Sequence, residues 1–407
     1  MAAITLFGSI EVVSTASAST TTEAARAIGA RCPSRGFDRG LRALAAARGK
    51  LVGTAYRSEH AADDPCYERV AVREFNSLTP EIATFSNRIA AVEGRDDFSD
   101  ADSICRLARR HRMACQVHDL IWDPVDHLEW GIVPAWIRAQ PPGPRRSTMI
   151  RYVRRVVRHF AGRADSYTVV NEAFDDAGRL TPGTWNTTGD DSYIFDAFRA
   201  ARRADPGAQL YYNDFGAEDL NAKSDAVFDL VRRLRRERVA VEVDGRIRHR
   251  PLIDGVGLQM HVGLGPGQAP DPASVAANIE RLGRAGLRVR ITEMDVRVPT
   301  SGGVATNADL LAQRRLYRRL VRTCLRAPSC DGVTFWGFTD AHSWITENPS
   351  SFEGEGAAHP FDQRYEAKPA YRGIRRALRR TRERSAVIRS EGTRHPPAPA
   401  SRRTSNG

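Results

Sequence analysis

Two glutamates, Glu172 and Glu293, each end a short apolar stretch of the chain and together form a pair suited to acid–base chemistry. In Leu287–Asp295, β-branched residues stand at every second position before Glu293, which predicts a strand that ends on a carboxylate. Tyr167–Glu172 has the same arrangement. Hydrolysis of a glycosidic bond requires two facing carboxylates, one as acid and the other as nucleophile or base. The alternative is that both glutamates only cap strands and face solvent.

The elements that would position these glutamates alternate between strand and helix along the chain. This alternation predicts a fold of the α/β class, a single (β/α)8 TIM barrel over residues 37–383, in which the carboxyl ends of all strands share one mouth. The predicted strands are Leu51–Ala55, Ser77–Pro80, Ala114–His118, Ser166–Val170, Gln209–Tyr212, Gly255–Leu258, Val289–Thr292 and Val333–Trp336. The main predicted helices are Phe37–Arg48, Ala101–His111, Thr148–Phe160, Tyr193–Ala204, Ser224–Glu237, Pro272–Ala285, Ala308–Arg326 and Ala370–Glu383.

Polar and aromatic side chains follow seven of the eight predicted strands. Chance can place one such residue at a strand end, but carboxylates, imidazoles, amides and indoles at seven ends favour a ligand-binding mouth over a set of structural caps. In chain order these residues are Glu81, His118, Trp122, Asn171, Glu172, Asn213, Asp214, Gln259, His261, Glu293, Asp295, Trp336 and Trp344.

The composition narrows the classes of partner. The 407-residue chain carries a net charge of +12, but only three of its 61 basic residues are lysines, and the arginines are spread over many predicted helices. This pattern does not favour nucleic-acid binding. No apolar run approaches the roughly 20 residues of a membrane span. Because the sequence has neither a glycine-rich phosphate loop nor a cluster of metal ligands, we expect no metal or cofactor. We also expect a monomer.

The six cysteines and the two ends of the chain bear on its location. No cysteines have C-x-x-C spacing, and a bridge between Cys324 and Cys330 is feasible if the protein is exported, whereas the pairing of the other four stays open. Residues 1–36 look like a leader and linker; they resemble a degenerate signal peptide, because Glu11 interrupts the apolar run and no basic residue precedes it. We therefore expect secretion. Residues 384–407 are basic and rich in Pro and Ser, which predicts a disordered tail.

The chain resembles glycoside hydrolase family 10, whose best-known members are endo-β-1,4-xylanases. The resemblance covers roughly residues 38–378 in collinear order. It is carried by Arg73–Glu81, Val169–Phe174, Leu210–Asp214, Gly255–His261, Ile291–Asp295 and Thr334–Asp340, and by Phe361-Asp362 and Lys368–Tyr371 near the end.

The resemblance implies a retaining hydrolase with Glu172 as acid/base and Glu293 as nucleophile, and xylan as the expected substrate. It implies that His261 and Asp295 support the nucleophile and that Asn171 contacts the sugar 2-hydroxyl. It also implies a disulfide between Cys324 and Cys330. The walls of the subsite for the attacked sugar would be His118, Trp122, Trp336 and Trp344, and Glu81, Asn213 and Gln259 are further candidates for substrate binding.

The departures from the family pattern cluster on one side of the predicted site. Ile82, Phe85 and Val125 stand where the family has an asparagine, a lysine and a glutamine that contact the next sugar on the non-reducing side. Each lost hydrogen bond to a buried hydroxyl costs about 1 to 3 kcal/mol. Either xylan is still cut through other subsites, or the substrate is another β-glycoside, such as a plant saponin glycoside. A third alternative is a carbohydrate-binding pseudo-enzyme that has lost turnover.

Overall fold

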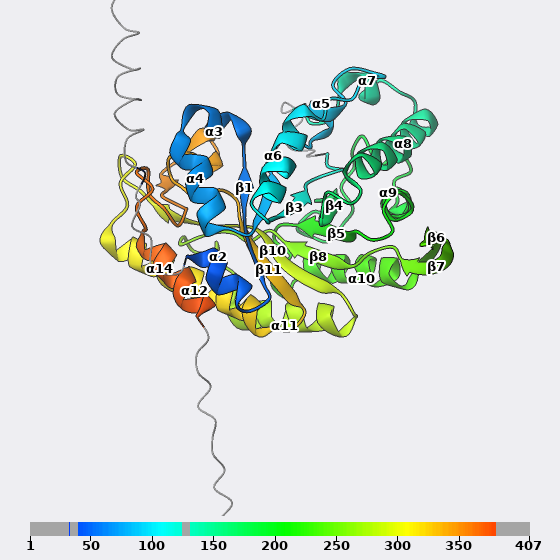
Figure 1. Cartoon of the computed structure of the whole chain (residues 1–407). Coiled ribbons are helices and arrows are strands. Elements are labelled where there is room, and N and C mark those ends of the chain that lie inside the picture. Colours follow the sequence, from blue (N-terminus) through cyan, green and yellow to red (C-terminus); the bar gives the residue numbers. More distant parts are fainter. Residues whose placement is uncertain (1–31, 33–39, 124–130, 380–407) are drawn as a thin grey trace, which may run out of the picture.

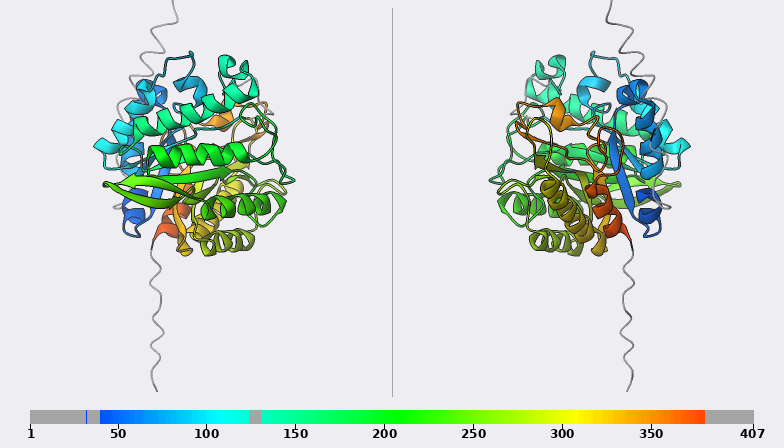
Figure 2. Two further views of the ribbon diagram at one scale, coloured as in Figure 1. Left: turned by 90° about the vertical axis from the view of Figure 1, so that its right-hand side faces the viewer. Right: turned by 90° about the vertical axis from the view of Figure 1, so that its left-hand side faces the viewer.

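The computed structural model describes residues 32, 40–123 and 131–379, which form one closed parallel barrel surrounded by helices (Figures 1 and 2). Each barrel strand pairs in parallel with its neighbours, and β11 closes the ring by pairing with both β1 and β10. The predicted TIM barrel is therefore confirmed. Its strands are β1 (Leu51–Tyr56), β2 (Ser77–Pro80), β3 (Ala114–Val117), β4 (Ser166–Asn171), β5 (Gln209–Asp214), β8 (Gly255–Leu258), β10 (Arg288–Pro299) and β11 (Cys330–Phe335).

The longer helices each bury one apolar face. In α12 (Asn307–Arg326), for example, Leu316, Leu320 and Cys324 recur at four-residue spacing and are buried. No helix in the described part of the chain is both long and apolar enough to cross a membrane. The other helices are α2 (Leu41–Ala46), α3 (Ser58–Asp63), α4 (Pro65–Glu74), α5 (Ser86–Ile89), α6 (Ser99–Arg110), α7 (Ala135–Arg138), α8 (Pro142–Phe160), α9 (Ser192–Ala204), α10 (Ala222–Arg236), α11 (Pro272–Arg284), α13 (Trp344–Glu347) and α14 (Pro369–Leu378).

Polar side chains fill the barrel interior because β8 is glycine-rich. A Cβ at Gly257 would lie only 2.1 Å from Asn213 Oδ1, so the missing side chain leaves room for the Asn213 amide. Towards the opposite end of the barrel, the buried Arg290 forms an ion pair with Asp331 and donates a hydrogen bond of 2.9 Å to Gln116. Glycine thus makes room for polar side chains, and the charge of Arg290 is compensated by Asp331.

One predicted strand end was wrong. β10 does not stop near Glu293 but continues to Pro299, because its later residues find partners outside the barrel. β9 (His261–Gly263) pairs with Asp295–Arg297, and β12 (Glu355–Gly356) pairs with the last two residues of β10. Glu293 therefore lies within a strand that is held on both sides.

A hairpin was not predicted. It consists of β6 (Arg238–Val243) and β7 (Arg246–Pro251), and it lies outside the barrel at the edge of the molecule (Figure 1). The helix predicted at Phe37–Arg48 is seen as α2, and residues 37–39 lie outside the described residues. The predicted leader, except for Cys32, also lies outside the described residues, and so do Val125 and the tail 384–407.

Three disulfides join all six cysteines. Cys324 is bonded to Cys330, Cys32 to Cys66 at the start of α4, and Cys105 in α6 to Cys115 in β3. The sequence had left the last two pairings open. Cys32, within the predicted linker, is thus covalently attached to the barrel domain.

Reducing the three bridges is expected to lower the melting temperature by about 5 °C or more, since each bridge restricts the unfolded chain and typically contributes about 2 to 4 kcal/mol. Calorimetry with and without a phosphine reductant measures the change. Thiol alkylation and mass spectrometry control for complete reduction, because the cysteines are buried. An unchanged melting temperature in fully reduced, folded protein would contradict a stabilising role.

Candidate active site

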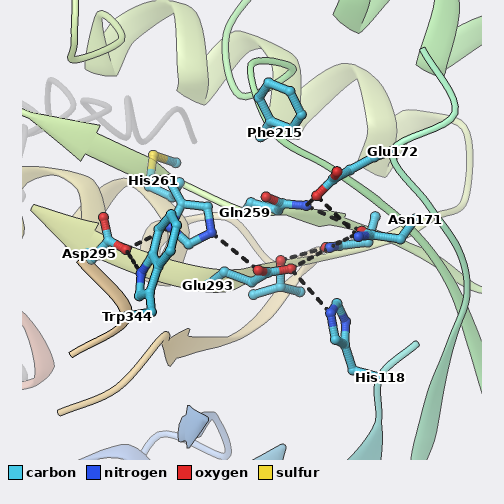
Figure 3. Close-up of polar contacts among 12 residues, drawn as sticks. His118, Asn171, Glu172, Phe215, Gln259, His261, Glu293, Asp295 and Trp344 are labelled. Carbon is cyan, nitrogen blue, oxygen red and sulfur yellow. Dashed lines mark hydrogen bonds and ion pairs between the residues drawn. The ribbon is translucent and has the colours of Figure 1, made fainter. Parts of the chain in front are cut away.

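Glu172 and Glu293 lie at the mouth formed by the carboxyl ends of the strands (Figure 3). Glu172 follows β4 directly and is partly exposed, whereas Glu293 is buried within β10. The backbone φ of Glu172 is +55°, in the left-handed region that residues other than glycine rarely adopt. Such strain persists only where the surroundings hold the residue, and it is common at functional sites.

Two amide side chains connect the carboxylates. Asn213 Nδ2 donates hydrogen bonds to Glu293 Oε1 at 2.6 Å and to Asn171 Oδ1 at 2.8 Å. Asn171 Nδ2 in turn donates to Glu172 Oε1 at 3.1 Å. The hydroxyl of Thr292 donates to Asn213 Oδ1 at 2.6 Å, which fixes the orientation of that amide. The two glutamates therefore belong to one hydrogen-bonded network.

His261 lies between the other oxygen of Glu293 and Asp295. The pairing of β9 with β10 places His261 beside Asp295, and the imidazole reaches Asp295 Oδ2 at 2.7 Å and Glu293 Oε2 at 3.2 Å. Burial alone would lower the pKa of His261, but Asp295 and Glu293 outweigh it and raise that pKa to about 10. At neutral pH the imidazole is therefore a cation that donates to both carboxylates and balances a negative charge on Glu293.

Glu172 is held differently. Gln259 Nε2 donates to Glu172 Oε1 at 2.7 Å, and Trp122 Nε1 donates to Oε2 at 2.8 Å. Burial raises the pKa of Glu172, the nearby Glu293 adds to the rise, and the two donors oppose it. A carboxyl with a raised pKa beside one that is bonded to His261 fits the division of roles between a general acid and a nucleophile.

Aromatic rings line the same mouth. The Trp336 ring lies 4.9 Å from His118 and 6.4 Å from His261, centroid to centroid, both edge to face. Trp344 Nε1 donates to Asp295 Oδ2 at 2.9 Å, so its ring is fixed beside His261. Indole faces suit sugars, because C–H groups pack on the ring while hydroxyls point to polar neighbours. The arrangement fits a site for a carbohydrate.

Comparisons with known proteins agree with this geometry. The sequence profile of Glycosyl hydrolase family 10 matches residues 40–377. The chain belongs to glycosyl hydrolase family 10. It is 35% identical to endo-1,4-beta-xylanase B of Thermotoga neapolitana over 77% of this chain and 83% of that protein.

Two solved family 10 structures also resemble it. Native xylanase 10B from Thermotoga maritima has a TM-score of 0.74 and 34% identity, covering 83% of this chain and 98% of that one. Xylanase 10B from Thermotoga petrophila RKU-1, solved in complex with xylobiose, has a TM-score of 0.75 and 32% identity, covering 84% of this chain and 98% of the other. The family assignment therefore extends over nearly the whole length of these structures.

Glu81 and Phe85 are two described residues from the side of the site where the sequence departs from the family 10 pattern. Glu81 does not project freely into the mouth, because Arg57 Nη2 lies 2.6 Å from Glu81 Oε1 while Arg57 Nη1 lies 3.0 Å from Glu347. The Phe85 ring packs 5.2 Å from the Trp122 ring, so an apolar surface stands beside the catalytic residues. Glu81 is therefore already held in an ion pair with Arg57.

Sequence reasoning did not find all the charged groups near the catalytic pair. Asp119 is buried, and its Oδ2 lies 3.6 Å from His118 Nε2 with no hydrogen-bond partner among the described residues. Burial and the nearby glutamates raise the pKa of Asp119 well above its ordinary value. Lys223 was also not predicted as a residue near the site. The chain has only three lysines, and this rarity is a signal that could have singled it out.

Proposed function

We propose that this family 10 member cleaves β-1,4-xylosidic bonds in xylan with retention of configuration. Glu172 would donate its proton to the glycosidic oxygen while Glu293 attacks the anomeric carbon, and the leaving chain departs as an alcohol. Glu172 would then take a proton from water, which displaces Glu293 from the covalent intermediate. The observation that carries the proposal is the contrast between Glu293, bonded to Asn213 and His261, and Glu172, whose pKa is raised by burial. The similarity to endo-1,4-beta-xylanases supports xylan as the substrate.

A second candidate is hydrolysis of a different β-glycoside with an apolar or decorated neighbour. Ile82 and Phe85 are apolar where the family pattern has an asparagine amide and a lysine amine. Glu81 is held in an ion pair with Arg57. We also propose that the protein is exported. Three disulfides support this, since such bonds persist mainly in oxidising compartments.

Incubation of the purified protein with soluble xylan is expected to release oligosaccharides whose first-formed anomer is β, as measured by proton NMR. Glu293→Ala, checked for folding by circular dichroism, is the matched control and is expected to be silent. A first-formed α anomer would contradict the retaining mechanism. Silence of the wild type on xylan together with turnover of aryl β-glycosides or plant glycoside extracts would favour the second candidate, and binding of xylan without any turnover would contradict hydrolysis.

A further inference from the structure

The peptide group that follows Glu172 is anchored by a buried tyrosine. Tyr212 in β5 is fully buried, and its hydroxyl accepts a hydrogen bond from the backbone N–H of Ala173 at 3.0 Å. The same hydroxyl donates to Asp214 Oδ2 at 2.6 Å. Because Glu172 has a positive φ, its backbone needs external support to keep the side chain in one place. Tyr212 and Asp214 provide that support from the adjacent strand.

Lys223 completes this arrangement from the first turn of α10. Its Nζ lies 2.9 Å from Asp214 Oδ1, and both side chains are 1% exposed. The ammonium also lies 3.6 Å from the centroid of the Phe215 ring, which covers it at the mouth. Figure 3 shows Phe215 above Glu172. Lys223 and Asp214 therefore form a buried ion pair, and the Phe215 ring covers the ammonium.

A structural explanation for Lys223 is weak. The first turn of a helix is the positive end of its dipole, where a cation is disfavoured, and α10 is already capped by Asn221 and Ser224. A buried ion pair is also often replaceable by apolar residues without loss of stability. The placement is better explained by what the charges do to a neighbour than by what they do for the fold.

The neighbour on which these charges act is Glu172. The cation of Lys223 lowers the pKa of Glu172, opposing the larger effect of burial, and a negative charge on Asp214 has the opposite effect. Burial raises the pKa of Asp214 to about 7, against the attraction of Lys223. The net charge of the pair thus changes in the pH range where a glycosidase acid works. Other titratable groups that face the pair or Glu172 are Asp119, Asp176, Tyr193, Glu218 and Glu293.

We propose that Tyr212, Asp214 and Lys223 form a positioning unit that holds Glu172 in place and sets the alkaline limit of its catalysis. The proposal rests on the proposed role of Glu172 as acid/base. None of the three residues needs to touch the substrate, because the unit acts through the backbone of Ala173 and through charge.

The test compares pH profiles of kcat/KM for the variants Lys223→Met, Asp214→Asn and the double variant, on the substrate that the wild type hydrolyses. Lys223→Met removes a cation and is expected to move the alkaline limb to higher pH by about half a unit or more. Asp214→Asn leaves the cation alone and is expected to move the limb to lower pH. The double variant, with neither charge, is expected to lie between the single variants.

The order of these shifts distinguishes an effect of charge on the alkaline limb from a general loss of stability. Arg290→Met breaks the ion pair with Asp331 towards the other end of the barrel, so it is a matched control that is expected to lower the melting temperature without moving the limb. Limbs that coincide for all variants would overturn the proposal, whatever their stability. Should Asp214→Asn fail to fold, Lys223→Met still decides, because an unmoved limb in that variant overturns the proposal.

Tyr212→Phe adds a readout of position. It removes the anchor of Ala173 and is expected to lower kcat about tenfold with little change in KM. An unchanged kcat would overturn the anchoring role. If Glu172→Ala leaves the alkaline limb of the wild type in place, the acid assignment itself fails; if that variant removes the limb but Lys223→Met does not move it, only the positioning unit fails.

Discussion

Replacing Glu293 with alanine is expected to reduce kcat by on the order of 10⁵-fold, the advantage that a positioned nucleophile has over one from solution. Asn213 and His261, which both bond Glu293, would remain and leave a polar cavity. Azide is therefore expected to enter the cavity in Glu293→Ala and restore turnover of an aryl β-glycoside. The product should be the α-glycosyl azide, because a single displacement inverts the anomeric centre.

The configuration of this azide product, determined by NMR, identifies the role of Glu293 independently of the rate. A β-glycosyl azide from Glu293→Ala would mean that another group still forms the covalent intermediate. Glu293→Gln is a useful control, since it keeps the volume of the side chain and leaves less room for azide. If azide restored the activity of Glu293→Gln as strongly as that of Glu293→Ala, this would argue against direct entry of azide into the cavity.

Replacing Glu172 with alanine is expected to have an effect that depends on the leaving group. Turnover of xylan should fall by about 10²- to 10⁴-fold, because the leaving oxygen no longer receives a proton. An aryl glycoside with an acidic phenol needs little such help, so its first step should be almost unchanged. Burial raises the pKa of Glu172, and the wild type is expected to lose activity as the pH rises past that pKa. That alkaline limb should be absent from Glu172→Ala.

Steady-state rates on a series of aryl glycosides measure this dependence. Azide is again informative, because in Glu172→Ala it would attack the covalent intermediate and give the β-glycosyl azide. Equal losses on good and poor leaving groups would contradict the acid role. Trp122→Phe, which removes one donor to Glu172 and keeps an aromatic ring, is a milder comparison for the same series.

The strands and the catalytic chemistry were predictable because short stretches of sequence indicate both. Val289 and Ile291 alternate with residues of the opposite face, which indicates a strand. In a parallel barrel the carboxyl end of every strand lies at the same mouth. Glu172 and Glu293 could therefore be paired across a long stretch of chain. The family motifs supplied roles for His261 that periodicity alone could not.

The rest depended on contacts between distant segments. β10 continues past Glu293 because β9 and β12 lie beside it, and both partners come from distant segments of the chain. Six cysteines allow 15 pairings, so Cys32–Cys66 could not be chosen from spacing. The bond from Arg57 to Glu81 joins loops after two different strands, and neither residue alone indicates it.

The scarcity of lysine has a practical side. Lys223 and Lys368 are buried and engaged with Asp214 and Asp340, which leaves Lys50 as the accessible lysine for amine-directed reagents. Burial lowers the pKa of Lys50, so more of it is free amine at neutral pH. Lys50 immediately precedes β1 and thus lies at the amino end of the barrel, away from the mouth. Coupling through lysine would therefore immobilise the protein with its active site facing away from the support.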